Sequence, residues 1–125
     1  MFADEHQLDL SLRVTGAFPG PDGLKRHFVE KCKEDNIVLT KEPAVETRLI
    51  LHFHLEEVHD RLLHGSDVKL FQGSCNLVLA HQGAETVRRA LHSKVISDRD
   101  VATAGRKISH FLLAQAYRIL TANLD

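Results

Sequence analysis

Histidine is the residue type whose count and spacing in this sequence could support chemistry, with nine copies in 125 residues. His52 and His54 lie two positions apart in a segment that alternates polar and apolar residues, so both side chains leave the same face of a strand. Imidazole is a common zinc ligand, and a third ligand could come from His92 or His59. The pair lacks the second paired motif that makes zinc signatures specific. A metal site of His52, His54 and His92 is therefore one alternative, and the main expectation is a protein without a cofactor.

The same alternation predicts a polar face of the sheet that is rich in arginine and histidine. The residues expected to form a binding surface there are Arg48, His52, His54, Arg88, His92 and Lys94. Such a face could bind an anionic ligand or lipid, or another protein, or it could simply be solvated, as the polar faces of antiparallel sheets are. Nucleic acid is not expected, because Phe53 and Phe71 have inward parity and leave no exposed rings on which bases could stack.

The search for catalytic motifs is negative. The chain has no Gly-rich phosphate loop, no G-x-S-x-G elbow and no H-E-x-x-H motif. Cys75 falls on an inward-facing position, where a thiol is inert. Glu56–Glu57 and His59–Asp60 gather carboxylates and imidazole at the end of a strand, but acid–base catalysis also needs a pocket around such groups. We therefore expect that the protein is not an enzyme.

Length and composition indicate a single domain over residues 1–125, because a chain of this size closes one hydrophobic core. Sixteen Lys and Arg balance 17 Asp and Glu, so the whole protein has no net attraction to nucleic acid or anionic lipid. The longest apolar runs, such as Phe111–Ala114, are far shorter than the roughly 20 residues of a membrane-spanning helix. No transmembrane segment is expected.

The two cysteines and the first residues bear on the cellular compartment. Cys32 and Cys75 are far apart and form no C-x-x-C pair, which favours two buried thiols over a disulfide. Met1–Ala3 leads directly into the polar residues Asp4–Gln7, so no export signal is visible. A chain from which the signal was removed would look the same, and the compartment stays open.

Apolar periodicity predicts the elements of the first half. Leu8, Leu10, Leu12 and Val14 alternate with polar residues and indicate a strand with one buried face. After a Gly- and Pro-rich turn, Leu24, Phe28 and Cys32 give a helix that ends near Asp35–Asn36. A short strand over 37–39 follows, parallel to the first. A longer strand then runs through Leu49, Leu51, Phe53 and Leu55.

The second half predicts a hairpin and a terminal helix. Phe71, Cys75, Leu77 and Leu79 share one face of a strand in which Gly73 could mark a bulge. A turn over 81–84 leads to a strand in which Val87, Leu91 and Val95 point inward. Ser97 and Asp100 resemble a capping box, and a helical pattern begins at Val101.

The predicted order is β-α-β-β-β-β-α. Two helices packed on one face of a mostly antiparallel sheet make an α+β two-layer sandwich. A polar face of the sheet is left open on the other side.

One stretch of this order resembles a known class of proteins. Over Leu24–Leu55 a helix is followed by Asn36–Leu39, a Pro-containing break and a long alternating strand, and a hairpin and terminal helix come after it. This resembles the small accessory domains of bacterial envelope lipoproteins, such as the lipopolysaccharide-assembly lipoprotein of the outer membrane. The resemblance implies a non-enzymatic periplasmic domain, tethered to a membrane, that docks on a partner protein or an anionic lipid.

The sequence therefore predicts an adaptor or assembly-accessory domain that acts through protein contacts, using the open sheet face or an edge strand. The alternatives are an anionic-ligand or nucleic-acid binder using the Arg/His-rich face, and a metal-binding protein. A homo-oligomer formed through a sheet edge fits the same elements. The expected location is the periplasm or the outer membrane if a signal was removed, and the cytoplasm otherwise.

Overall fold

The strands that the alternating residues predict form one sheet. The structure is a computed structural model that describes residues 6–16, 22–40, 45–58 and 68–124. Its strands are β1 (His6–Gly16), β2 (Ile37–Leu39), β3 (Thr47–Val58), β4 (Lys69–His81), β5 (Ala84–His92) and β6 (Ile96–Asp98). Their spatial order is β2-β1-β3-β4-β5, and β6 also pairs with β4. β1 is parallel to both of its neighbours and the remaining pairs are antiparallel.

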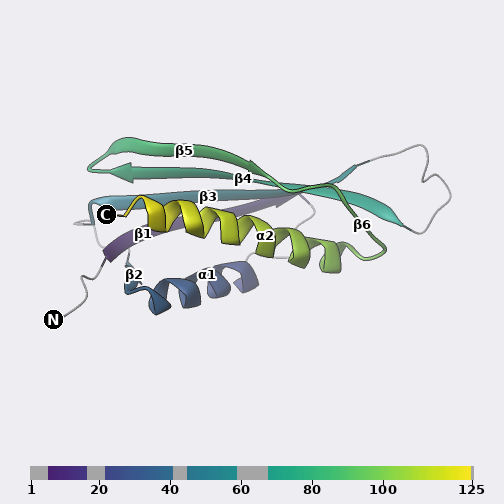
Figure 1. The fold of residues 1–125 in the computed structure, drawn as a ribbon, viewed down its shortest axis with the longest axis horizontal. Helices are drawn as coiled ribbons and strands as arrows, with labels where there is room; N and C mark the ends of the chain where they lie inside the picture. The colour runs from purple at the N-terminus through teal and green to yellow at the C-terminus, as the bar shows by residue number, and fades with distance from the viewer. Residues whose placement is uncertain (1–5, 17–21, 41–44, 59–67, 125) are drawn as a thin grey trace.

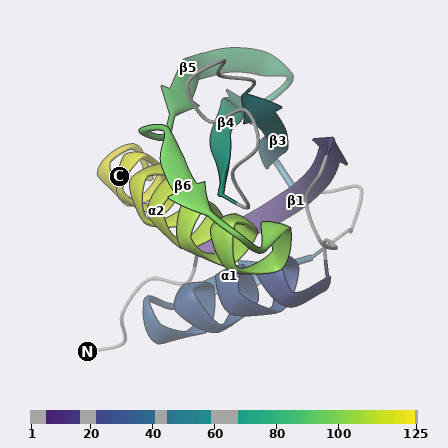
Figure 2. The ribbon, with the colours of Figure 1, turned by 90° about the vertical axis from the view of Figure 1, so that its right-hand side faces the viewer.

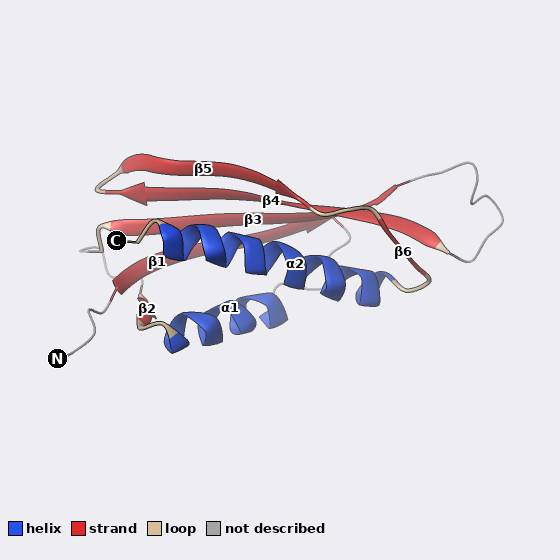
Figure 3. Ribbon diagram, viewed as in Figure 1, coloured by secondary structure: helices blue, strands red, loops and turns tan. Residues whose placement is uncertain are grey.

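Two helices, α1 (Asp22–Glu34) and α2 (Val101–Ala122), lie on the same side of this sheet (Figures 1 and 2). α2 packs mainly over β4, and α1 lies against β2. Figure 3 shows the resulting two layers, with helices on one side and strands on the other. The predicted α+β two-layer sandwich and its element order are confirmed, with the short strand β6 added between β5 and α2.

The core lies between the two layers. Leu49, Leu51, Phe53 and Leu55 of β3 are fully buried, as parity predicts, and Phe28 of α1 and Leu112 of α2 meet them from the other layer. Cys32 and Cys75 are also buried and free, and burial raises the pKa of each thiol to about 12. Both thiols are therefore protonated and inert at neutral pH.

The helix ends follow from local chemistry. Asn36 adopts the left-handed conformation (φ 59°) just after α1, as the sequence predicts. α2 is capped by Asp100, whose carboxylate accepts hydrogen bonds from Ala102 N at 3.1 Å and Thr103 Oγ1 at 2.9 Å. The predicted capping box is wrong, because Asp100 is itself the N-cap and Ser97 is a residue of β6 that pairs with Leu70.

Tyr117 joins the two helices. Its hydroxyl lies 3.0 Å from Lys31 O and also contacts the Asp35 carboxylate at the end of α1. Burial and the nearby Asp35 carboxylate both raise the pKa of Tyr117. The ring packs edge-on against Phe28, with centroids 6.0 Å apart. Tyr117 thus ties the two helices together on the same side of the sheet.

Candidate functional site

The face of β1, β3, β4 and β5 opposite the helices is called the open face below. Strand register arranges its side chains in rows that cross the sheet. One row joins Arg13, His52 and Asn76, because Arg13 pairs with His52 and His52 with Asn76. The next row joins the residues Thr15, His54, Ser74 and His92 in the same way. Register thus brings a patch of hydrogen-bonding side chains together from four strands.

Thr15 fixes the two central imidazoles. Its Oγ1 lies 2.9 Å from His52 Nε2 and 2.8 Å from His54 Nδ1. A hydroxyl carries one proton, so it can donate to only one ring and must accept from the other if both bonds form. Both rings are half-buried. The sequence predicted both histidines on this face but not Thr15. The alternation in β1 would have placed Thr15 there, because it lies two residues after Arg13 and therefore on the same face.

Two of the predicted arginines are neutralised by carboxylates on the sheet. Arg48 Nε lies 3.3 Å from Asp9 Oδ2. Arg88 Nε donates a 2.8 Å hydrogen bond to Glu85 Oε1, and this bond raises the pKa of the arginine. Among the described residues, Arg13 has no such partner. The uncompensated guanidinium of the open face is therefore Arg13, which was expected to be exposed but was not expected to be a site residue.

Aliphatic side chains lie beside this patch. Ile50 of β3 pairs directly with Val78 of β4, and Ile50 is 40% exposed. Ser11 flanks Ile50 on β1, and Arg88 flanks Val78 on β5. An aliphatic pair within a border of arginine and histidine resembles the composition of protein interfaces, which combine an apolar centre with a polar rim.

The residues of the metal alternative lie in neighbouring rows. His54 and His92 occupy the same row but are separated by Ser74 of β4, and His52 lies one row further along. In the part of the chain that the structure describes, no three His, Cys, Asp or Glu side chains are placed to hold a metal ion. His59, the other third ligand considered, lies outside the described residues.

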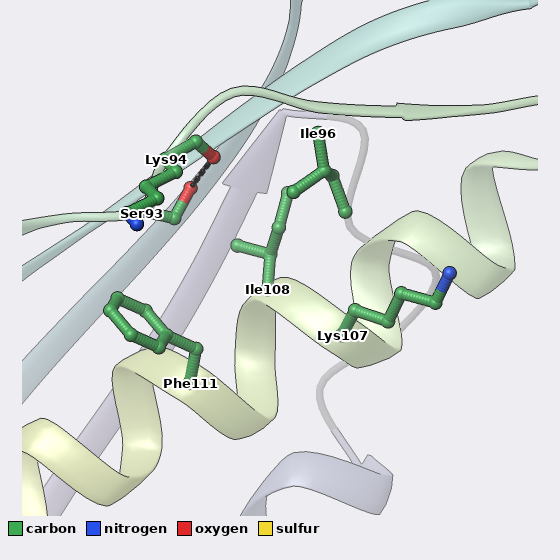
Figure 4. Close-up of a pocket in the computed structure, with 6 residues that line it drawn as sticks. All are labelled: Ser93, Lys94, Ile96, Lys107, Ile108 and Phe111. Carbon is green, nitrogen blue, oxygen red and sulfur yellow. Dashed lines mark hydrogen bonds between the residues drawn. The ribbon is translucent and has the colours of Figure 1, made fainter.

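Lys94 lies elsewhere than the alternation predicts. β5 ends at His92, and the structure places Lys94 beside α2, where it lines a hollow with Ser93, Ile96, Lys107, Ile108 and Phe111 (Figure 4). The cause is a bulge: between the pairs Ser74–His92 and Phe71–Ile96, two residues of β4 face three residues, 93–95, of the edge. The extra residue reverses the parity, so Val95 is 47% exposed instead of buried.

Ser93 builds this bulge. Its backbone N–H donates to Gly73 O at 2.9 Å, and its Oγ accepts from Gly73 N at 2.9 Å. The same Oγ donates to Lys94 O at 2.9 Å. The side chain thus takes the place of a ladder partner. Gly73 is not the bulged residue that the sequence predicted, because β4 keeps an unbroken register with β3 through it.

The described residues thus define an α+β sandwich with an open, Arg/His-bearing sheet face and a small hollow at one edge. No described helix is long and apolar enough to span a membrane. No protein-family model matches the chain, and the search of curated proteins gave no significant match.

Solved structures share the fold at low sequence identity. Rare lipoprotein B from Shewanella oneidensis matches with a TM-score of 0.58 at 18% identity, over 94% of this chain and 92% of that one. A minor lipoprotein from Acinetobacter baumannii matches with a TM-score of 0.53 at 12% identity, over 90% and 93%. A protein from Xanthomonas campestris matches with a TM-score of 0.61 at 11% identity, over 98% and 85%. The chain therefore has a fold that bacterial lipoproteins also have.

Proposed function

We propose that this chain is a non-enzymatic adaptor or assembly-accessory domain of the bacterial cell envelope, and that it binds a partner protein through its open face. The observation that carries the proposal is the pairing of the exposed Ile50 with the half-buried Val78, beside the Arg13–His52 row on one uninterrupted part of the sheet. The bacterial lipoproteins that share the fold support a place in the cell envelope.

The size of the open face fits a protein partner. β3 has 12 residues and β4 has 13, and four strands lie side by side. At a rise of about 3.3 Å per residue and a strand spacing of about 4.8 Å, the four strands cover roughly 700 Å², close to the roughly 800 Å² that each partner buries in a standard interface. A small molecule would leave most of it uncovered.

The anchor groups of such an interface are Arg13 and the two histidines. Among the described residues Arg13 has no carboxylate partner, so it is available to pair with a carboxylate of the partner, whereas Arg48 and Arg88 have carboxylate partners of their own. The Thr15 hydroxyl restrains His52 and His54 before binding, which reduces the entropy that binding would cost. Arginine is among the residues that contribute most to binding energy at interfaces.

Site-specific cross-linking tests the proposal. A photo-activated cross-linking amino acid is placed at Ile50 in the native cell, and at Lys25 of α1 as a matched exposed control on the helix side. We expect a defined adduct with an envelope protein from position 50 and none from position 25. The adduct should be lost in Arg13→Glu. Equal adducts from both positions, or none from position 50, would contradict the proposal.

A second candidate is an anionic small ligand, which the uncompensated Arg13 next to His52 favours. Binding of phosphate or a carboxylate there would weaken steeply as salt is raised, because exposed charges are screened over about 10 Å at 0.1 M salt. A salt titration followed by the amide resonances of Arg13, His52 and Asn76 separates the two candidates. Saturable phosphate binding in the absence of any protein adduct would favour the small ligand.

A further inference from the structure

The hollow beside the β5–β6 bulge lies apart from the open face. Ser93, Lys94 and Ile96 line it from the edge of the sheet, and Lys107, Ile108 and Phe111 line it from α2. Figure 4 shows the three apolar side chains grouped together, with the ammonium groups of the two lysines on either side of them in this view. Phe111 is 44% exposed although it is a large aromatic residue. A single exposed aromatic ring is common on protein surfaces, so what indicates a contact site here is the hollow that Phe111 lines.

The walls of the hollow favour an apolar occupant. Ser93, the polar residue of the lining that is buried, uses its hydroxyl both to accept from Gly73 N and to donate to Lys94 O. Its hydrogen bonds are thus made within the bulge. The remaining contact surface comes from Ile96, Ile108 and the Phe111 ring. A polar occupant would lose its hydration and gain little in return.

The volume of the hollow selects the kind of occupant. It measures about 240 Å³. That exceeds the roughly 150 Å³ of an apolar cavity that holds benzene, and it falls below the roughly 300–1,000 Å³ of small-molecule pockets. The hollow therefore fits one large side chain, as an anchor pocket in a protein interface does.

The rim selects the charge of the occupant. Lys107 Nζ lies 3.3 Å from Asp98 Oδ2, so its charge is already compensated. Among the described residues, the exposed Lys94 has no carboxylate partner. A carboxylate next to the inserted side chain would therefore find Lys94 available.

We infer that this hollow anchors a single aromatic or large aliphatic side chain from an acidic segment of a partner protein, with Lys94 contacting the carboxylate beside it. The inference rests on the proposed function, since both need a protein partner, but it assigns a second and separate contact surface.

Short peptide probes test the anchor directly by nitrogen-15 NMR. The probe is acetyl-Glu-Phe-Glu-amide at millimolar concentration, and the controls are the same peptide with Ala in place of Phe and with Lys in place of both Glu. We expect saturable shifts of the amides of residues 93–96 and 107–111 with the probe. The Ala control should give no saturable shifts, and the Lys control should bind more weakly than the probe.

Variants separate the apolar contact from the charge. Phe111→Ala should weaken binding of the probe peptide by about fivefold or more, as loss of an interface anchor does. Lys94→Glu should weaken binding of the probe peptide by about two- to fivefold, the usual effect of losing an exposed ion pair. Lys25→Glu, at an exposed position of α1, should leave this binding unchanged. Thermal unfolding of each variant checks that the fold is kept.

Four outcomes would overturn the anchor. The first three are no saturable shift at the hollow, shifts confined to Ile50 and His52 on the open face, and equal binding of the acidic and basic peptides. Concentration-dependent shifts of the same amides without peptide would identify a second copy of this chain as the occupant and would also overturn it. Cross-linking from Ile50 reports on the open face alone, so failure of the anchor and failure of the proposed function are distinguishable.

Discussion

The strand pairing of β4 is regular along one edge and irregular along the other. On one edge, β3 keeps a single register from Thr47–His81 to Val58–Leu70. On the other edge, the register with β5 shifts between Leu79 and Ala80, and a second extra residue precedes β6. The pairing of β3 with β4 is thus regular, and the outer edge carries two extra residues.

The difference follows from what each strand buries. In β3 and β4, the inward side chains of both strands are in the core, so a slip of one residue would expose all of them to solvent. β5 is an edge strand that buries Val87 and partly buries Leu91, so an extra residue costs it little. Bulges are tolerated where burial is slight, and the edge is where the hollow forms.

The largest expected effect contrasts one side chain from each region. Phe53→Ala should lower the free energy of unfolding by about 3–5 kcal/mol, because Phe53 is fully buried and its loss leaves a cavity. Val95→Ala, in the bulge, should change it by about 0.5 kcal/mol or less, since Val95 is 47% exposed. Urea unfolding of both variants measures the two changes in the free energy of unfolding. Similar decreases in the two variants would show that the edge is packed as tightly as the centre.

Gly73 is where the two regions meet and gives the next largest effect. A Cβ at this position would overlap Ile108 Cγ2 and lie 3.3 Å from Leu112 Cδ1. Gly73→Ala should therefore destabilise the protein by about 1–3 kcal/mol through overpacking. Gly23→Ala in α1 is the matched control, because its Cβ would meet nothing within 4 Å. If Gly73→Ala is as harmless as the control, α2 does not pack closely on β4.

Period-two and helical patterns were sufficient to predict the centre of the fold. Each strand there buries one face, so the inward positions of β3 and β4 could be read from alternation alone, as could the buried stripe of α1. Gly73 shows the limit of such patterns. A glycine within a strand is consistent with a bulge or with a close helix. At Gly73 the helix is close, at Ile108, and a bulge lies on the opposite edge strand, and neither could be read from alternation.

The candidate sites were less predictable. His52, His54 and His92 fall on the expected face because register carries parity across strands. Lys94 does not, because alternation carries no sign of an extra residue, and the side-chain hydrogen bonds of Ser93 depend on contacts between strands. Arg13 could be placed on the open face, but that it has no ion pair within the described part of the chain depends on where Asp9 and Glu85 lie.

Ser93→Ala tests whether the serine hydroxyl maintains the bulge. The variant leaves the buried Gly73 N–H without its side-chain acceptor, which should cost about 1–2 kcal/mol. Ser97→Ala in β6 is the control, because Ser97 is exposed. Hydrogen exchange of the Gly73 amide should speed up in Ser93→Ala and not in Ser97→Ala. Unchanged exchange would mean that the backbone holds the bulge by itself.

The smallest effect is expected at the N-cap of α2, the helix that forms the other wall of the hollow. Hydrogen bonds from Thr103 Oγ1 and Ala102 N hold the pKa of Asp100 below its usual value. A carboxylate with a lowered folded pKa stabilises the protein above its unfolded pKa of about 3.9, and this contribution is lost as pH falls through the folded pKa. Asp100→Asn retains a capping oxygen but not the charge.

Wild type should therefore be slightly more stable than Asp100→Asn at neutral pH, and the difference should shrink as pH falls from about 3.9 through the lower folded pKa of Asp100. Asp98, whose pKa is also lowered, mainly by the hydrogen bond from Asp100 N, is present in both proteins and largely cancels in the comparison. Urea unfolding at a series of pH values measures the difference. A difference that stays constant with pH would show that the cap acts through its hydrogen bonds and not through its charge.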